Sequence, residues 1–485
     1  MYVMMRFFIL VCATGVLLRA DGPGVTTAFS PPLMNGIIGQ QSMAYNSTDN
    51  QYCLVWLDEA GFNNINCALY NPDGTPASAQ TSLSNAAQSP YICYNSTNNQ
   101  YFIAWAANDN IQFIVIDNAT NVVVPVQSIP LSAGLFAGAD VTCCYNSVSN
   151  EYCITWIEWD GATPPSQLYF ALVDATGAVV KGETEISSGA GLAAGDALTP
   201  FVTYNSRKNE YFFTWFGTDG TNNYLLFALY DAGGNAITSA QVIPQFTGYG
   251  LSGNTPFSCY NTVTNQYFVT WVASPPTLGQ AYPFYAIYNS SGAVVVPTTA
   301  VTPQQDAFQI NSTPVCSYNM HDNIYFLSWS DVSNPVVAAT LAADGSIING
   351  YIVIPVVSGG NPEGLVFNVF GINPAEYFIV WHTADHIAAF YNIFIIDPPI
   401  PTQFTGKKRL NRFINYGEYF VNLSWQPSIS LYLQSYKIYR NGAFIARVSP
   451  LATFISLHNQ PRQGSVYGVQ AVNSFGGTNT AQVLI

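Results

Sequence analysis

The apolar and polar positions of this chain follow a repeated pattern that predicts short antiparallel β-strands. Four segments, Tyr91–Tyr94, Gln100–Ala106, Ile111–Asp117 and Val122–Val126, are rich in aromatic and β-branched residues, and the second alternates apolar and polar positions. Asn95–Asn99 is predicted to be a turn, because Asn and Ser side chains bond to their own backbone and Asn tolerates a positive φ. Together these segments predict a meander of four strands.

The same frame recurs seven times along the chain, with a Trp eleven residues after a leading aromatic residue. The leading residues are Tyr45, Tyr94, Tyr145, Tyr204, Tyr260, Tyr318 and Phe370, and the Trp residues are Trp56, Trp105, Trp156, Trp215, Trp271, Trp329 and Trp381. The intervals between successive Trp residues run from 49 to 59 residues. This period is near the roughly 50 residues of propeller blades.

A single four-stranded sheet of this composition has two apolar faces and cannot bury both by itself. Radial stacking of several sheets covers these faces and leaves only short edges exposed. We therefore expect an all-β fold with a seven-bladed β-propeller of four-stranded antiparallel blades over residues 23–396. A pair of β-sandwiches is the alternative architecture, although a sandwich does not require one motif seven times.

The seventh copy is shorter than the others and needs a strand from elsewhere. It has the strands Ile387–Tyr391 and Ile393–Ile396, and the chain then changes character. Val25–Phe29, near the other end of the chain, is a candidate to complete this sheet. Closing the ring in this way would remove a free sheet edge.

The N-terminal residues 1–20 have the features of a secretory signal peptide. Arg6 supplies a positive charge, Phe7–Leu18 is apolar, and Leu18–Ala20 is a plausible cleavage site. The apolar run is short for a membrane span, and no other stretch is long and apolar enough for one. We expect a secreted, cell-surface or envelope protein without a transmembrane span.

Residues 397–485 form a second predicted domain after the stiff linker 398–401. Val421–Trp425 contains a Trp in an early strand, Tyr436–Gly442 follows, and Tyr467–Asn473 reads Tyr-Gly-Val-Gln-Ala-Val-Asn. This part resembles a fibronectin type III domain, which implies a small β-sandwich. It contains no Arg-Gly-Asp tripeptide, so the resemblance does not imply integrin binding through that motif.

The seven-copy part resembles the Tyr-Asn-Ser…Asn-x-Tyr…Trp repeats of exported bacterial proteins. It lacks the Gly-Gly of kelch blades, the Trp-Asp ending of WD40 blades and the Ser-x-Asp-x-Gly-x-x-Trp boxes of sialidases. The resemblance therefore implies an architecture and does not imply an activity.

Charge is sparse and unevenly divided between the two predicted domains. The net charge is −14 and only 8% of residues are charged. Residues 21–396 carry 25 acidic and 3 basic side chains, whereas residues 397–485 carry 2 and 8. The acidic part should repel phosphates, which argues against a nucleic-acid partner. The basic side chains Lys407, Lys408, Arg409 and Arg412 predict a solvated loop, or a contact with an anionic glycan, a lipid headgroup or the acidic propeller.

The turns that follow the repeated Trp residues carry acidic and aromatic side chains. In a propeller these turns lie on one face, so they predict either ordinary turn chemistry or a rim that binds a protein, a cation such as calcium, or a glycan. Aromatic side chains there could stack on the apolar C–H faces of sugars. The candidate rim residues are Asp58, Glu59, Phe62, Asp109, Glu158, Trp159, Asp160, Phe216, Asp219, Asp331 and Asp385.

Eight cysteines follow the predicted signal peptide, and export would permit disulfides. The predicted hairpins place Cys143 opposite Cys153 and Cys53 opposite Cys67, which makes these two pairs candidate disulfides. Other cysteines precede the leading Tyr of a repeat and are expected to be buried thiols. The sequence has no C-x-x-C motif, so we expect no zinc site.

No catalytic constellation is evident in the sequence. A nucleophile elbow, a Walker loop and a dinucleotide fingerprint are all missing, and His382, Asp385 and His386 are too far apart along a strand to favour a metal site. We therefore expect a non-enzymatic binding or adhesion protein without a cofactor, whose partner is a protein or glycan at the cell surface. The alternatives are a secreted hydrolase or lyase acting on glycans through the propeller pocket, and a structural component of the envelope or surface layer.

Overall fold

The computed structural model describes most of the chain. The described ranges are 27–35, 38–58, 64–84, 88–107, 110–132, 136–138, 140–159, 166–186, 197–218, 221–246, 248–251, 255–275, 281–301, 310, 312–331, 336–354, 362–371, 376–383, 388–395, 402–412, 417–426, 435–472 and 481–485. All regular elements in these ranges are β-strands. Among these residues, no helix has the length and hydropathy that crossing a membrane requires.

The first thirty strands form seven antiparallel sheets in the described part of the chain. The first strands of the sheets are β2 (Ile38–Asn46), β6 (Gln88–Asn95), β11 (Thr142–Asn146), β15 (Ala197–Asn205), β20 (Phe257–Asn261), β24 (Val315–Asn319) and β28 (Pro362–Phe370). The second strands are β3 (Gln51–Asp58), β7 (Gln100–Ala107), β12 (Glu151–Trp159), β16 (Glu210–Thr218), β21 (Gln266–Ser274), β25 (Ile324–Trp329) and β29 (Glu376–Thr383).

The two remaining positions of each sheet complete the meander. The third strands are β4 (Asn64–Tyr70), β8 (Asn110–Asp117), β13 (Gln167–Asp174), β17 (Asn223–Asp231), β22 (Tyr282–Asn289), β26 (Val336–Ala342) and β30 (Ala388–Ile395). The fourth strands are β5 (Thr81–Ser84), β9 (Val122–Pro130), β14 (Val179–Glu185), β18 (Ala236–Ile243), β23 (Val294–Ala300), β27 (Ile347–Ile354) and β1 (Thr27–Asn35). Two short strands, β10 (Phe136–Ala137) and β19 (Gly250–Leu251), pair with β12 and β21.

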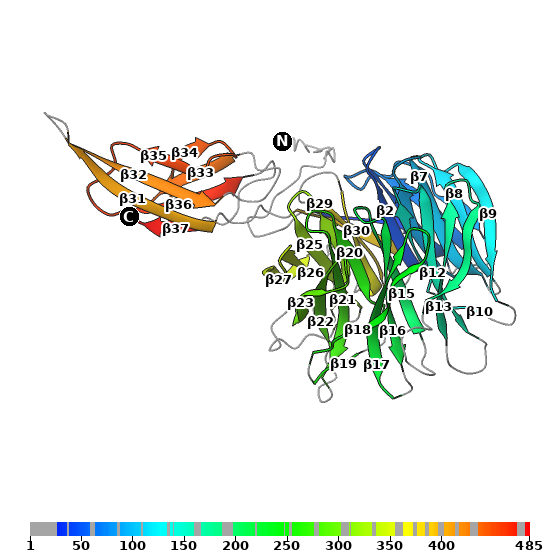
Figure 1. The fold of residues 1–485 in the computed structure, drawn as a ribbon. Helices are drawn as coiled ribbons and strands as arrows, with labels where there is room; N and C mark the ends of the chain where they lie inside the picture. Colours follow the sequence, from blue (N-terminus) through cyan, green and yellow to red (C-terminus); the bar gives the residue numbers. More distant parts are fainter. Residues whose placement is uncertain are drawn as a thin grey trace, which may run out of the picture.

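The first strands contact one another in a closed cycle. Each first strand contacts the first strand of the next sheet, in the order β2, β6, β11, β15, β20, β24, β28 and again β2. Figure 1 shows these sheets arranged around a common axis, with the fourth strands, such as β9, at the outside. The alternative of two separate sandwich cores is thereby excluded for these sheets.

The seventh sheet takes its outer strand from the N-terminal part of the chain. Strand β1 pairs antiparallel with β30, and the register places Thr27 opposite Ile393 and Phe29 opposite Tyr391. The expectation that the segment ending at Phe29 completes the last sheet is confirmed for residues 27–29, while Val25 and Thr26 lie outside the described residues. The ring thus closes with a strand from each end of the repeat region.

The repeated Tyr-Asn-Ser turn is held by hydrogen bonds that its own residues supply. In the second sheet, the Asn95 Oδ1 atom accepts the backbone N–H groups of Thr97 and Asn98, each at 2.9 Å. The Tyr94 hydroxyl donates to Asn99 Oδ1 at 3.0 Å, and Asn99 has a φ of 55°. A positive φ is costly for most residues and is tolerated by Asn, which explains why an Asn ends this turn in each of the first six copies, at Asn50, Asn99, Asn150, Asn209, Asn265 and Asn323.

The Asn that follows the leading Tyr of a repeat also links neighbouring sheets. Asn95 Nδ2 donates to the Tyr152 hydroxyl and to Asn150 Oδ1, both at 2.9 Å and both in the third sheet. Equivalent bonds to a Tyr of the next sheet are made by Asn146, Asn205 and Asn261. The motif is therefore a connector between neighbouring sheets as well as a turn signal.

Stacked aromatic rings lie beneath this hydrogen-bonded layer. A Phe in the second strand of one sheet stacks on the Tyr of the next sheet, with ring centroids 4.0 to 4.5 Å apart. The pairs are Phe102–Tyr152, Phe212–Tyr267, Phe268–Tyr325, Phe326–Tyr377 and Phe378–Tyr52. The last pair joins the seventh sheet to the first, which is independent evidence that the ring is closed.

The seventh copy departs from the motif at one residue. Gly371 stands where the other copies have the connector Asn. A Cβ atom at Gly371 would collide with the hydroxyl of Tyr52 in the first sheet. The sequence therefore loses the connector where the two ends of the ring meet, and the Tyr52 ring occupies the space instead.

The last seven strands form two further sheets. One contains β31 (Thr402–Arg412), β32 (Gly417–Gln426) and β35 (Phe454–Leu457), and the other contains β34 (Ala443–Val448), β33 (Ser435–Arg440), β36 (Val466–Val472) and β37 (Ala481–Leu484). Their buried residues, among them Trp425 and Tyr436 with ring centroids 5.2 Å apart, form one hydrophobic cluster. Figure 1 shows these strands as a unit of their own beside the ring.

Candidate functional site

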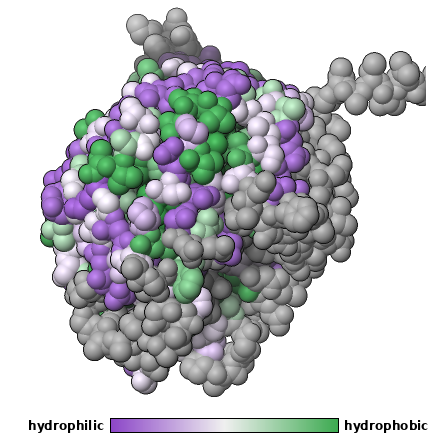
Figure 2. Space-filling model, turned by 90° about the vertical axis from the view of Figure 1, so that its right-hand side faces the viewer, coloured by the Kyte–Doolittle hydropathy of each residue, from purple (hydrophilic) through white to green (hydrophobic). Residues whose placement is uncertain are grey.

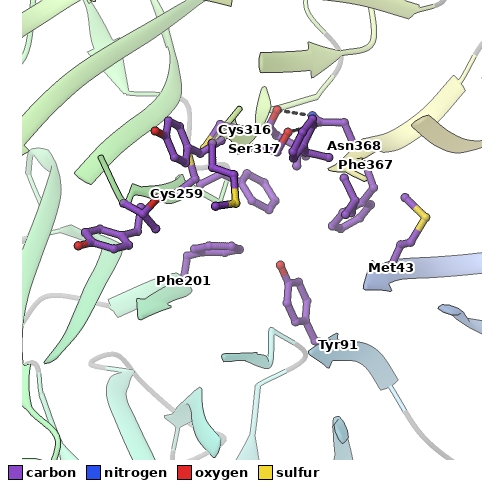
Figure 3. A pocket seen from close by; sticks show the side chains of 16 residues that line it. Met43, Tyr91, Phe201, Cys259, Cys316, Ser317, Phe367 and Asn368 are labelled. Atoms are coloured by element: carbon purple, nitrogen blue, oxygen red, sulfur yellow. Dashed lines mark hydrogen bonds between the residues drawn. The ribbon is translucent and has the colours of Figure 1, made fainter. Parts of the chain in front are cut away.

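A cavity of about 430 Å³ lies among the first strands of six sheets. Its wall is formed by residues of β2, β6, β15, β20, β24 and β28, and Figure 3 shows their side chains surrounding it. The cavity exists because the first strands converge at the centre of the ring, where side chains from many sheets meet. Pockets of 300 to 1,000 Å³ are typical of small-ligand sites, which makes this cavity the candidate functional site.

Four aromatic side chains at equivalent positions form one end of the cavity. Tyr91, Phe201, Phe257 and Phe367 each precede the leading aromatic residue of their repeat by three positions. Phe201 and Phe257 lie 4.9 Å apart between ring centroids, and Phe257 meets Phe367 edge-on at 6.2 Å. Tyr91 meets Phe201 and Phe367 edge-on at 6.0 and 6.4 Å. Edge-to-face packing of this kind gives an ordered aromatic floor.

Tyr91 adds a hydrogen-bonding group to this floor. Its hydroxyl points into the cavity between Phe201 and Phe367 (Figure 3). Burial raises the pKa of Tyr91 well above its usual value, with the neighbouring cysteines as a smaller cause. The hydroxyl therefore stays protonated at neutral pH and can donate or accept a hydrogen bond.

A network of polar side chains fixes one side of the wall. Asn368 Nδ2 donates to the Val315 carbonyl and to Ser328 Oγ, each at 2.7 Å, and Ser328 Oγ donates to the Val366 carbonyl at 2.8 Å. Ser317 Oγ donates to Asn368 Oδ1. These bonds hold the side chains of Ser317 and Asn368 in place beside the cavity (Figure 3), so these polar groups need not reorganise to contact a ligand.

The mouth of the cavity lies at the end where the Tyr-Asn-Ser turns are. Tyr260, Thr262, Tyr318 and Met320 line it, and Met320 is 53% exposed. The Tyr318 hydroxyl donates to Asn323 Oδ1 at 2.9 Å, and burial raises its pKa to about 12. A ligand would therefore meet hydroxyl groups and a thioether at the entrance and aromatic rings inside.

The residues that line the cavity carry no ionisable acid or base of the kind used in hydrolysis. None of the sixteen is Asp, Glu, His, Lys or Arg. Within the described ranges, no cluster of three or more His, Cys, Asp or Glu residues could hold a metal ion. The site can hold a ligand through apolar contact and hydrogen bonds, and its wall offers no pair of carboxylates for acid–base chemistry.

Only part of the predicted rim lies within the described residues. Asp58, Glu158, Trp159, Phe216 and Asp331 are described, whereas Glu59, Phe62, Asp109, Asp160, Asp219 and Asp385 lie outside. Trp159 is 45% exposed and its ring lies 6.2 Å from that of Phe136. Asp58 is half-buried at the end of β3.

Three of the predicted rim residues are buried, so the assignment is wrong for them. Phe216 is 2% exposed in the core and Asp331 is 1% exposed. Glu158 is also 1% exposed, and its Oε1 atom accepts a hydrogen bond from the Trp156 indole at 2.7 Å. Glu158 and Phe216 are buried because β12 and β16 continue beyond the Trp residue, to Trp159 and Thr218, so the segments predicted as turns are strands. Asp331 lies beyond the end of β25 and forms an isolated bridge with Ile310.

Glu158 nevertheless has an unusual pKa for a carboxyl group. Burial raises its pKa to about 7, against a usual value of 4.5. The nearby Glu183 contributes in the same direction, whereas the hydrogen bond from Trp156 opposes the shift. The adjacent residues Glu158 and Trp159 drew attention to this position in the sequence, but they did not indicate that Glu158 is buried.

A second group of described carboxylates lies at the opposite ends of the sheets. They lie in the turns between third and fourth strands and in the Tyr-Asn-Ser turns, where they accept hydrogen bonds from turn residues. Bonds from Thr75, Ser346 and Asn99 lower the pKa of Asp73, Asp344 and Asp49 respectively, and backbone bonds from Asn235 lower that of Asp231. This is ordinary turn chemistry.

The side face of the ring is mixed in character. Figure 2 shows small apolar and polar groups interspersed over it. Exposed aliphatic pairs recur at the start of the outer strands, such as Val122 and Val123 in β9 and Val179 and Val180 in β14.

The basic residues after the linker lie in a strand and do not form a loop. Lys407, Lys408, Arg409 and Arg412 belong to β31, where successive side chains point to opposite faces. Lys408 Nζ donates to the carbonyls of Arg462 and Gln463 at 3.1 and 3.0 Å and lies 5.5 Å from the centre of the Tyr419 ring. Lys408 thus contributes to packing within the sheets of residues 402–485. The four basic side chains of the predicted patch are divided between the two faces of β31.

The predicted cysteine registers need correction. Cys143 lies opposite Ile154, and it is Cys144 that lies opposite Cys153. Cys53 lies opposite Leu69 and Cys67 opposite Val55, so this pair is diagonal. The eight described cysteines are free thiols in this structure.

Comparison with known proteins relates the fold to β-propellers. No protein-family model matches the sequence, and no curated protein matches it significantly. Among solved structures, the BP39L lectin from Burkholderia pseudomallei aligns with a TM-score of 0.55 and 14% identity over 74% of this chain and 96% of the lectin. The Dos1 propeller aligns with a TM-score of 0.45 and 10% identity over 74% of this chain and 94% of its own. The ring of four-stranded antiparallel sheets is therefore a β-propeller fold.

Proposed function

We propose that this chain is an exported, non-enzymatic binding protein that recognises a glycan or protein ligand at a cell surface through its propeller. The observation that carries the proposal is the central cavity, which combines an aromatic floor with fixed hydroxyl and amide groups and has no Asp, Glu, His, Lys or Arg among its lining residues. The similarity to a lectin supports binding as the function, although at 14% identity it concerns the fold.

The finer architecture belongs to the same proposal. We infer that the seven sheets are seven blades within residues 23–396, that residues 1–20 are a signal peptide, and that residues 397–485 are a fibronectin type III sandwich. The closed cycle of first strands supports the blade count. The two sheets around Trp425 and Tyr436 support the sandwich.

A sugar residue suits the chemistry of the cavity. The C–H face of a pyranose can pack on Phe201 or Phe257, and its hydroxyl groups can bond to the Tyr91 hydroxyl and to Ser317. The cavity volume is within the usual range for one small ligand. A side chain of a protein partner with an aromatic ring and a polar end would use the same contacts.

A glycan array probed with the full chain tests the proposal. We expect binding to a defined set of glycans that falls about tenfold in the variant Tyr91→Phe, because a hydrogen bond to the ligand is lost while the ring remains. Tyr439→Phe, whose hydroxyl donates to Gln470 far along the chain from the cavity residues, is the matched control and should bind normally. Equal binding by Tyr91→Phe and the parent chain would place the ligand elsewhere, and no binding to any glycan would leave protein ligands as the class to be screened by the same pair of variants.

One observation favours a glycan-cleaving enzyme as the second candidate. A carboxyl group with a pKa of about 7, next to another carboxylate, is typical of a general acid. Incubation of the bound glycans with the chain and measurement of new reducing ends separates the two functions. Release of reducing ends that stops in Glu158→Gln would replace the binding proposal, and unchanged glycans would support it.

A further inference from the structure

The eight described cysteines are arranged as four neighbouring pairs. In each pair the pKa of one thiol is raised by burial and, to a smaller extent, by the thiol of its partner, which identifies the two side chains as neighbours. The pairs are Cys53–Cys67, Cys93–Cys143, Cys144–Cys153 and Cys259–Cys316. Every described cysteine belongs to one pair, so the arrangement accounts for all of them.

Packing and register support the same pairing independently. The two members of each pair belong to, or pack against, one hydrophobic cluster. Cys144 and Cys153 are direct partners across the β11–β12 hairpin. Cys53 and Cys67 lie diagonally on one face of the β3–β4 hairpin. The direct pair has the close Cβ spacing that suits a disulfide, whereas diagonal residues lie further apart, so the Cys53–Cys67 bond requires a local shift of its hairpin.

The other two pairs cross from one sheet to the next. Cys93 is in β6 and Cys143 is in β11, while Cys259 is in β20 and Cys316 is in β24. Both pairs of strands are in contact near the axis of the ring. Cys259 and Cys316 also form part of the cavity wall (Figure 3).

The hairpin pairs stand where the aromatic stack between sheets is interrupted. Cys53 and Cys153 occupy the second-strand position that is Phe102, Phe212, Phe268, Phe326 or Phe378 in the other five sheets. Where the Phe is present it stacks on the next sheet. A covalent bond at these two positions would tie the second strand to a neighbouring strand of the same sheet, at the places where the stack on the next sheet is missing.

We propose that the four pairs form four disulfides in an oxidising compartment, two of them within sheets and two, Cys93–Cys143 and Cys259–Cys316, binding adjacent sheets together. This goes beyond the proposed ligand recognition and does not depend on it. With a small disulfide such as oxidised glutathione as oxidant, one protein thiolate attacks the disulfide and releases one glutathione thiol. The second protein thiolate then displaces the other glutathione, so that two protein thiols lose two electrons and two protons for each bond formed.

The buried position of the thiols determines when this chemistry takes place. Burial raises the pKa of Cys53, Cys93, Cys153 and Cys259 well above the usual value. Since the thiolate is the reactive form, exchange in the folded chain is slow. The bonds should form while the chain folds, and they should resist a reductant until a denaturant is added.

The full chain with Cys12→Ser, which removes the ninth cysteine, is used for the test. It is refolded in a glutathione redox buffer, unfolded and treated with a maleimide. We expect no labelled thiol and, in a non-reducing digest, peptides joined only between the stated partners, with the Cys93 and Cys153 peptides both joined to the peptide that carries Cys143 and Cys144. Complete labelling of all eight cysteines, or bonds between other partners such as Cys93 and Cys144, would overturn the proposal.

Single variants resolve the adjacent residues Cys143 and Cys144, which share a peptide. Cys93→Ser should leave one labelled thiol, at Cys143, and keep the Cys144–Cys153 bond. Cys153→Ser should leave Cys144 labelled instead. If these variants do not fold, the parent chain still decides the matter, because reduction in denaturant should lower its melting temperature after refolding by on the order of 5–10 °C. An unchanged melting temperature would count against cross-links between sheets.

Discussion

The seven contacts between neighbouring sheets in the described chain are of two kinds. Five contain a stacked Phe–Tyr pair, such as Phe268 on Tyr325 at 4.3 Å. Two have a cysteine in place of the Phe, Cys53 before Tyr101 and Cys153 before Tyr211. A hydrogen bond from the connector Asn to the Tyr of the next sheet is present in both kinds, as Asn261 to Tyr325 and Asn146 to Tyr211 show. It is described at four of the seven contacts, so it does not depend on whether the apolar layer below contains a Phe or a Cys.

The largest effect is expected from removing a stacked ring. Phe268→Ala should destabilise the fold by about 3–5 kcal/mol, because a large buried side chain is lost and a cavity remains. Cys153→Ala under reducing conditions should cost only about 1 kcal/mol. Denaturant unfolding of both variants measures the difference, and equal losses would show that the stack is not what distinguishes the two kinds of contact.

Removing a connector Asn should cost slightly less and should not distinguish the two kinds of contact. Asn261→Ala leaves the N–H groups of Val263 and Thr264 and the Tyr325 hydroxyl without their partner, which should cost about 2–4 kcal/mol. Asn146→Ala should cost a similar amount at a cysteine contact. Thermal melting compares them, with Val263→Ala at an exposed position of the same turn as a control, and a much smaller loss for Asn146→Ala would contradict a polar layer shared by the two kinds of contact.

The contact that closes the ring offers a steric test. Gly371→Ala should destabilise the chain by about 1–3 kcal/mol, because the new Cβ collides with the Tyr52 hydroxyl. Gly182→Ala is the matched control, since no atom lies within 4 Å of a Cβ there. Combining Gly371→Ala with Tyr52→Phe should recover stability in the same melting assay. A double variant no better than the single one would refute the collision as the cause.

The smallest effect is a pH dependence in the sheet that carries Cys153. The pKa of Glu158 is about 7 in the folded chain and near 4.5 when unfolded, so its neutral form stabilises the fold. That contribution is complete below about pH 4.5 and is lost as the pH rises through 7. Melting temperatures measured between pH 5 and 8.5 should fall less in Glu158→Gln than in the parent chain. Parallel curves for the two proteins would show that Glu158 ionises normally.

Repetition is what made most of the fold predictable from the sequence. The pattern of a single copy, such as residues 91–126, predicted four strands, and these recur in every sheet. Because the seventh copy is short, it also indicated that a strand from the N-terminal part of the chain completes the seventh sheet. The function of the connector Asn could not be foreseen, because its partners Tyr152 and Asn150 belong to another copy. Contacts between copies depend on how the sheets are placed, which local patterns do not reveal.

Turn geometry explains the errors about individual residues. The β11–β12 hairpin closes at Asn146 and Glu151, one residue away from the symmetric turn assumed, so Cys144 and not Cys143 faces Cys153. A slip of one residue changes the face of every side chain. The prediction of an exposed rim was wrong at Glu158 and Phe216 for a related reason. The strands continue past Trp156 and Trp215, so both side chains are buried.

The sequence predicted a central pocket only as part of the alternative of a secreted hydrolase or lyase, and it did not identify the residues that line it. Which side chains would meet at the axis could not be derived, because Tyr91, Phe201, Phe257 and Phe367 come from four copies and are spread over 277 residues of sequence. Their equivalent positions before the leading aromatic residue are the signal that could have identified them.

The pairing of β1 with β30 makes the last sheet depend on a segment that is synthesised before the other six sheets. Six sheets can assemble from neighbouring segments as synthesis proceeds, but the seventh is complete only when β1 meets β30. Removal of β1 or of β30 would therefore damage the same sheet, and the final step in closing the ring is a single long-range docking event.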